Sequence, residues 1–118
     1  MKKIIFYSYL KCSTCRKAAK WLESNDFEFQ LIDIVNEPPL VIYLNLAFEQ
    51  YSDDKKRIFN TRGQAFKTLS LDIYGLSREE IIQLLLSDGK LIKRPFLIYE
   101  GNKVILGLNE IEYAKQFL

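Results

Sequence analysis

The stretch Lys11-Cys12-Ser13-Thr14-Cys15-Arg16 holds both cysteines of the 118-residue chain and lies where a strand-like segment gives way to a helix-like one. Before it, residues 3–8 form an apolar run of strand length. After it, helical spacing links Cys15 with Ala19 and Leu22. We therefore expect Cys12 in the turn that starts a helix, and Cys15 one turn further on, on the face that the helix buries.

This position favours a reactive thiolate at Cys12. The unpaired backbone N–H groups and the dipole of a helix start stabilise negative charge, and Lys11 and Arg16 add positive charge nearby. Only the thiolate form of a cysteine is a nucleophile. Cys15 is close enough in sequence to form a disulfide with Cys12 after Cys12 has attacked another molecule. The pattern is therefore typical of a redox-active pair.

Two other interpretations of the cysteines stay open. Cysteines are often buried for packing alone, and a single C-x-x-C is also half of many zinc sites. A structural zinc site needs four ligands, yet the sequence has no histidine and no third cysteine. A zinc site would have to be shared with another chain, so we expect no metal site within one chain.

Length and composition indicate an ordinary globular protein with one domain, residues 1–118. The hydrophobic content of 48% gives no sign of disorder, and a net charge of +2 argues against direct binding of nucleic acid. Ser8 and Lys11 interrupt the first apolar run too early for a signal peptide, and no membrane segment follows. We therefore expect a cytoplasmic protein. No nucleotide fingerprint is present, so no bound cofactor is expected.

The rest of the chain continues an alternating α/β pattern. Residues 27–35 read as a second strand, parallel to the first because a helix connects them. A helical stretch of about residues 37–90 follows. Its segment 40–50 predicts a helix that is apolar nearly all round, and such a helix is either deeply buried, which we favour, or shared with a partner chain. The segment from Asp53 to Arg57 predicts a solvated turn. Ser77 to Glu80 forms a capping box that opens another helix.

The last third of the chain predicts a hairpin and a final helix. Pro95 enters a third strand, which Glu100-Gly101-Asn102 turns into a fourth. The final helix starts near Asn109, and we expect it to pack Ile111, Tyr113 or Ala114, and Phe117 inward. The resulting order, β-α-β, a helical insert and β-β-α, is the layout of thioredoxin and glutaredoxin.

Within that layout the chain resembles the ArsC/Spx/MgsR family in four blocks that run from end to end: Cys12–Ala18, Asn60–Arg62, Leu91–Pro95 and Gly107–Glu110. The resemblance implies a four-stranded mixed sheet flanked by helices, with the helical insert between the second and third strands. It also implies a cis peptide bond before Pro95, facing Cys12.

For the arsenate reductases of this family, the resemblance implies that Cys12 attacks an oxyanion surrounded by three arginines. Arg62 and Arg94 fall on two of these positions, whereas Gly107 occupies the third. Lys103 is a candidate to replace the missing cation in part, although an ammonium lacks the planar fork of a guanidinium. We expect arsenate to be a doubtful substrate.

The same reductases usually lack a second cysteine at the Cys15 position and pass their mixed disulfide to glutathione and glutaredoxin. Regulators that resemble Spx carry the C-x-x-C, and bind the RNA polymerase α subunit through a glycine where this chain has Asp54. The chain thus combines features of both branches.

Our leading interpretation is an arsenate reductase-like thiol oxidoreductase with Cys12 as nucleophile and Cys15 as resolving thiol. Arg16, Arg62 and Arg94 would bind an oxyanion or stabilise the thiolate, and the reductant would be glutathione with glutaredoxin, or thioredoxin. The alternative is a redox-sensing regulator that binds RNA polymerase through a Cys12–Cys15 disulfide switch.

Overall fold

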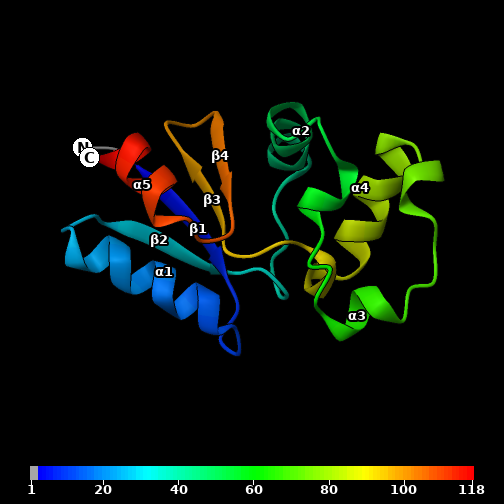
Figure 1. The fold of residues 1–118 in the computed structure, drawn as a ribbon, viewed down its shortest axis with the longest axis horizontal. Helices are drawn as coiled ribbons and strands as arrows, with labels where there is room; N and C mark the ends of the chain where they lie inside the picture. Colours follow the sequence, from blue (N-terminus) through cyan, green and yellow to red (C-terminus); the bar gives the residue numbers. More distant parts are fainter. Residues whose placement is uncertain (1–2) are drawn as a thin grey trace.

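The computed structural model describes residues 3–118 and contains a four-stranded sheet in the order β2-β1-β3-β4 (Figure 1). The strands are β1 (Ile4–Ser8), β2 (Phe29–Asp33), β3 (Phe96–Tyr99) and β4 (Lys103–Leu106). Strands β1 and β2 are parallel, while β3 is antiparallel to both β1 and β4. The predicted thioredoxin-like mixed sheet is therefore confirmed.

Helix α1 (Ser13–Ser24) connects β1 to β2, and α5 (Glu110–Phe117) ends the chain. The helical insert lies between β2 and β3, as predicted, and forms the half of the molecule opposite α1 and α5 (Figure 1). It contains three α-helices and three short 3-10 helices: α2 (Val41–Gln50), η1 (Lys55–Ile58), α3 (Gln64–Lys67), η2 (Ile73–Gly75), α4 (Arg78–Ser87) and η3 (Gly89–Leu91). Among residues 3–118, none of the helices is long and apolar enough to span a membrane.

Alternation along the strands sends side chains into two cores, one on each face of the sheet. The first core joins β1 and β3 to α1 and α5; its largest fully buried members include Phe6, Leu22 and Tyr113. The second joins the opposite faces of the same strands to the insert, with Phe96 and Leu85 among its buried members. Both faces of the central strands β1 and β3 are covered, and these strands are correspondingly apolar, whereas the edge strand β2 is largely exposed.

Two helices each expose an apolar residue that was expected to be buried. Helix α2 buries Leu44 and Ala47 completely, but Ile42 in its first turn is 63% exposed, so the expected burial all round the helix is wrong there. In α5, Tyr113 and Phe117 are buried as predicted, but Ile111 is 73% exposed, so its expected burial is wrong. A helix of eight residues presents one narrow face to the sheet, and Ile111 lies outside it.

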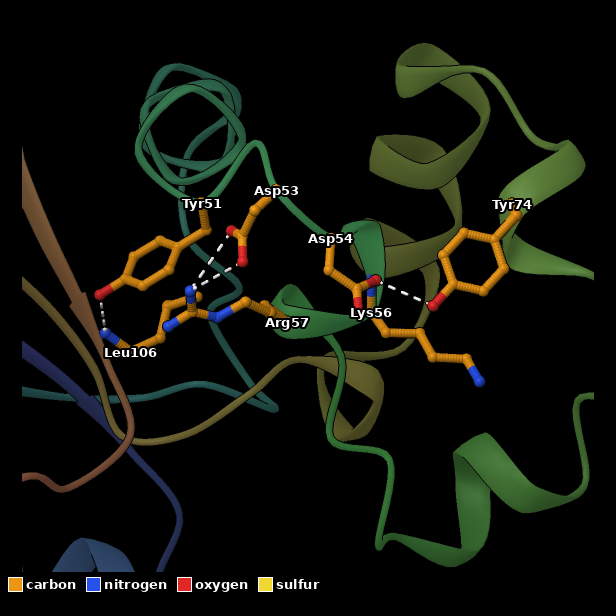
Figure 2. Close-up of polar contacts among 7 residues, drawn as sticks. All are labelled: Tyr51, Asp53, Asp54, Lys56, Arg57, Tyr74 and Leu106. Atoms are coloured by element: carbon orange, nitrogen blue, oxygen red, sulfur yellow. Dashed lines mark hydrogen bonds and ion pairs between the residues drawn. The ribbon is translucent and has the colours of Figure 1, made fainter.

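The end of α2 is hydrogen-bonded to the edge strand β4. Gln50 Nε2 donates to Val104 O at 2.9 Å, and Val104 N–H donates to Gln50 Oε1 at 2.9 Å. The backbone N–H of Leu106 donates to the Tyr51 hydroxyl at 3.1 Å (Figure 2). These side chains bond to the strand edge much as another strand would, and they fix the insert against the sheet.

Candidate active site

Cys12 is the N-cap residue of α1. Its backbone is extended, with φ −99° and ψ 110°, and its sulfur accepts a hydrogen bond from the backbone N–H of Cys15 at 3.2 Å. The Cys12 N–H donates to Tyr9 O at 3.0 Å, which closes the turn before the helix. The side chain is partly exposed. The sulfur thus takes the place of a capping oxygen, at the helix end where negative charge is stabilised.

Cys15 has the opposite environment. Its side chain is fully buried beneath α1, and burial raises the pKa of the Cys15 thiol to about 12. The Cys12 side chain contributes to this rise in the Cys15 pKa, whereas the polar groups of the Tyr9 backbone and the Ser8 side chain oppose it. Both cysteines are free thiols. Cys12 is therefore the accessible sulfur, and Cys15 holds its proton.

Two of the predicted arginines lie against the loop that precedes Cys12. Arg16 Nη1 donates to Leu10 O at 2.7 Å. The Arg94 guanidinium lies over the Tyr9 ring, 4.9 Å from its centroid, and donates to Lys90 O at 3.2 Å. The peptide bond from Arg94 to the buried Pro95 is cis. Cations from two separate elements thus border the turn that carries the nucleophile candidate.

Arg62 lies in an exposed turn between η1 and α3. The chain just before this turn pairs with the segment that leads into β3. Asn60 N–H donates to Leu91 O at 2.8 Å, and Lys93 N–H donates to Ile58 O at 2.7 Å. This backbone pairing holds the Arg62 turn beside the segment that leads to Arg94, although the two positions are far apart in sequence.

The expected role of Lys103 is wrong. Lys103 is paired with Glu100 Oε2 at 3.0 Å and lies opposite Tyr99 in the sheet. Tyr99 in turn lies opposite Ile4, at the start of β1, whereas Cys12 follows the end of β1. Lys103 is therefore at the far end of the sheet from the cysteines.

Lys93 is a cation that the sequence analysis missed. A Cβ added to Gly107 would lie 3.2 Å from Lys93 Cε and 3.9 Å from its Nζ, so Lys93 lies where a side chain at position 107 would begin. Lys93 also lines a cavity of about 390 Å³ together with Arg57 and Thr61. Its position next to Arg94 was the one signal in the sequence.

Asp54 stands where the resemblance to Spx-like regulators implies a glycine, and its side chain is hydrogen-bonded to neighbouring residues. Asp54 is the N-cap of η1; its Oδ1 accepts hydrogen bonds from Lys56 N–H at 2.9 Å and from the Tyr74 hydroxyl at 2.9 Å (Figure 2). These hydrogen bonds hold the pKa of Asp54 below its ordinary value, and the bond to Asp54 raises that of Tyr74.

Arg57 adds a further link to this segment. It lies over the Tyr51 ring at 4.5 Å and pairs with Asp53 at 3.3 Å (Figure 2). The solvated turn expected at Asp53 to Arg57 is confirmed, since the side chains of Arg57 and Asp53 are 50% and 65% exposed, and part of it forms the short helix η1. Within residues 3–118, His, Cys, Asp and Glu side chains form no cluster of three or more that could hold a metal ion.

Comparison with known proteins agrees with this architecture. The model of the ArsC family matches residues 7–116. The chain is 41% identical to the uncharacterized protein YusI of Bacillus subtilis, a match that covers 97% of this chain and 98% of YusI. It is 32% identical to the regulatory protein MgsR of the same species, with coverage of 97% and 90%.

A solved structure adds evidence for the fold. The crystal structure of a possible arsenate reductase from Streptococcus mutans is 40% identical and superposes with a TM-score of 0.78, covering 90% of this chain and 91% of that one. Family model, relatives and three-dimensional structure agree over nearly the whole length. This protein belongs to the ArsC family.

Proposed function

We propose that the protein is a thiol–disulfide oxidoreductase in which Cys12 is the nucleophile and Cys15 the resolving thiol. The supporting observation is the asymmetry of the pair. The Cys12 sulfur is partly exposed at a helix N-terminus and accepts the Cys15 N–H at 3.2 Å, while the Cys15 side chain is fully buried one turn on. The helix end stabilises the thiolate form of the exposed cysteine, so this cysteine attacks first. The buried neighbouring cysteine then attacks the mixed disulfide that results.

In the proposed cycle, the Cys12 thiolate attacks a sulfur of a substrate disulfide and forms a mixed disulfide, which releases the first substrate thiol. Cys15 then loses its proton and attacks Cys12 Sγ, which forms the Cys12–Cys15 disulfide and releases the second thiol. The substrate gains two electrons and two protons, and the protein loses them. A thiol reductant, glutathione with glutaredoxin or thioredoxin, restores the two protein thiols.

Arsenate is a poor substrate in this proposal. The reductases that the chain resembles surround arsenate with three guanidinium groups, whereas here Gly107 replaces one of them and Lys93 lies beside it. An ammonium is a point charge without the fork that binds two oxygens at once. Losing one charged hydrogen-bonding partner weakens oxyanion stabilisation by about ten- to a hundred-fold.

The test follows the two sulfurs separately. Reduced protein is mixed with oxidised glutathione, quenched with acid and analysed by intact mass spectrometry. We expect a transient glutathione adduct and then a monomer that has lost two hydrogens. Cys15→Ser should accumulate the adduct on Cys12, and Cys12→Ser should form neither product. An adduct on Cys15 in the unsubstituted protein, or a disulfide-linked dimer as the main product, would overturn the proposal.

A regulatory function is the second candidate, because MgsR is 32% identical and is named a regulatory protein. The hydrogen bonds of Asp54 oppose it, since they occupy the position at which the resemblance implies a polymerase contact. Reduced and oxidised protein are passed over an immobilised C-terminal domain of the RNA polymerase α subunit, with Asp54→Gly as the comparison. We expect no retention of the unsubstituted protein. Retention that depends on its redox state would establish the regulatory function instead.

A further inference from the structure

The two edges of the sheet differ in how their backbone groups are paired. On the β4 edge, both backbone groups of Val104 and the N–H of Leu106 are hydrogen-bonded to the side chains of Gln50 and Tyr51. On the opposite edge, β2 pairs with β1 and with no other strand of residues 3–118 (Figure 1). The sheet therefore has one edge that α2 closes and one edge that is open to a further strand.

The hydrogen bonds to β1 show which groups of β2 face the open edge. Ile34 N–H donates to Ser8 O at 2.8 Å, so the Ile34 N–H points towards β1. Because this direction alternates along a strand, the backbone groups of Phe29, Leu31 and Asp33 point away from β1. Among the described residues, the outward N–H and C=O groups of Phe29 and Leu31 have no hydrogen-bond partner.

The middle of this open edge is apolar. Leu31 lies opposite Phe6 in the register of β1 and β2, and Phe6 belongs to the core that α1 covers. The Leu31 side chain is therefore on the α1 face of the sheet, yet it is 63% exposed. The sequence of β2, Phe29–Asp33, contains neither lysine nor proline, the residues that commonly protect an open edge from pairing.

We propose that two copies of this chain form a dimer through their β2 edges, which pair antiparallel about a two-fold axis between the two Leu31 residues. In this register the two Leu31 residues exchange N–H···O hydrogen bonds, and Asp33 N–H donates to Phe29 O of the other copy. The Asp33 carbonyl already accepts from Glu37 N–H at 2.8 Å, so the pairing ends there. The two Asp33 carboxylates lie at opposite ends of the paired segment and do not face each other.

The contrast between the two edges favours a second copy as the partner and limits the assembly to two chains. Since α2 closes the β4 edge, the open β2 edge of one copy has no β4 edge to pair with, and a filament cannot grow. An edge that pairs with its own counterpart uses the same surface twice and closes as a dimer. The two Leu31 side chains then lie on the same face and cover each other.

The first test is sedimentation velocity of the reduced protein, with a reductant present so that no disulfide links two chains. Two short strands bury little surface, so we expect a weak, reversible dimer and choose a concentration series from about 30 μM to about 1 mM. The apparent mass should rise with concentration above the 13.9 kDa of one chain. An unchanged mass across the series would overturn the inference.

Leu31→Lys places two ammonium groups opposite each other at the two-fold axis and removes the leucine contact. It should raise the dissociation constant by about ten-fold, whereas the monomer should fold unchanged because Leu31 is exposed. Ile42→Lys is the matched control, since Ile42 in α2 is also 63% exposed, and it should leave the dimer unchanged. Dissociation by Ile42→Lys but not by Leu31→Lys would overturn the inference and assign the contact to α2.

Amide exchange measured by NMR at both ends of the series tests the register. The outward amides of Leu31 and Asp33 should exchange several-fold more slowly at the high concentration, because pairing protects them. The Ile34 amide, which already donates to Ser8 O, should change little. A dimer that leaves exchange at Leu31 and Asp33 unaltered would show that the contact lies elsewhere, and would contradict pairing through β2.

Discussion

The two sulfurs lie one helical turn apart, yet their surroundings predict very different reactivity. Cys12 is partly exposed at the N-terminus of α1, whereas Cys15 is fully buried and its pKa is raised to about 12. Since only the thiolate is alkylated, iodoacetamide should modify Cys12 first at every pH from 6 to 10, and Cys15 should react slowly until the fold opens. Peptide mass spectrometry of samples quenched at timed intervals measures both rates.

A denatured sample provides the control, because both thiols are then solvated and should react at similar rates. The prediction would fail if Cys15 in the folded protein were alkylated as fast as Cys12. That result would mean that the buried face of α1 opens more readily than its packing indicates.

Gly107 limits how this site can be redesigned. It has a φ of +76°, a conformation that side chains with a Cβ rarely adopt, and a Cβ there would meet Lys93 Cε at 3.2 Å. Gly107→Arg supplies the arginine that the reductases have at this position, but we expect it to lower the free energy of unfolding by about 1–2 kcal/mol. Urea unfolding measures the loss.

Gly107→Asn separates backbone strain from bulk, because asparagine tolerates a positive φ better than other residues. The asparagine variant should lose less stability than the arginine variant. Equal stability of Gly107→Arg and the unsubstituted protein would show that the backbone at this position adapts without cost.

For single residues, the sequence predicted the surroundings of the two cysteines but not those of the cations. Cys12 and Cys15 were identifiable because a helix start and a buried face follow from local spacing. The position of Lys103 was predicted wrongly, since strand register places it opposite Tyr99, and Tyr99 opposite Ile4 at the start of β1.

Among the elements, the contact between α2 and β4 is one that sequence spacing does not reveal. Gln50 exchanges two hydrogen bonds of 2.9 Å with Val104, 54 residues away. Gln50→Ala removes both and leaves the strand edge to solvent. At about 0.5–1.5 kcal/mol for each hydrogen bond, we expect a loss of about 1–3 kcal/mol in the free energy of unfolding.

Hydrogen exchange adds a local readout to this prediction. The Val104 amide should exchange faster in Gln50→Ala, because its acceptor is the Gln50 side chain. Glu49→Ala, at the exposed neighbouring position, serves as the control and should change neither quantity. Unaltered exchange at Val104 in Gln50→Ala would show that the hydrogen bonds of Gln50 do not protect the edge of β4.

Local capping signals, by contrast, were sufficient to place whole helices. Ser77 and Glu80 form the predicted capping box at the start of α4, and Asn109 caps α5 by accepting from Glu112 N–H at 3.1 Å. Such motifs involve residues only three apart, so the sequence contains them completely. The face that α5 buries depends instead on the sheet beneath it, which is why Ile111 was misplaced.

For the whole molecule, the order of strands and helices was sufficient to predict most of the fold. A βαβ unit, an insert and a hairpin have few ways to form one mixed sheet, and the four family blocks selected among them. The insert adds a second core on the far face of the sheet, so both faces depend on buried groups that are uncharged near neutral pH.

That dependence predicts a loss of stability at high pH. The pKa of Cys15 rises from an ordinary 9.0 to about 12 in the fold, and burial raises that of Tyr113 from 10.0 as well. Between about pH 9 and 12 the unfolded chain therefore releases protons that the folded chain retains. Because the unfolded state then binds fewer protons, stability falls as pH rises, by up to about 1.4 kcal/mol per pH unit for each group.

The measurement is the free energy of unfolding in urea between pH 7 and 11, with a reductant present to keep the thiols free. We expect a plateau near neutral pH and then a decline that begins at about pH 9, where the unfolded Cys15 starts to ionise. Cys15→Ala removes one of the groups that titrate, so its curve should fall less steeply even if its stability at pH 7 is lower. Parallel curves for the two proteins would show that Cys15 ionises alike in both states, and that the buried environment assigned to the resolving thiol is wrong.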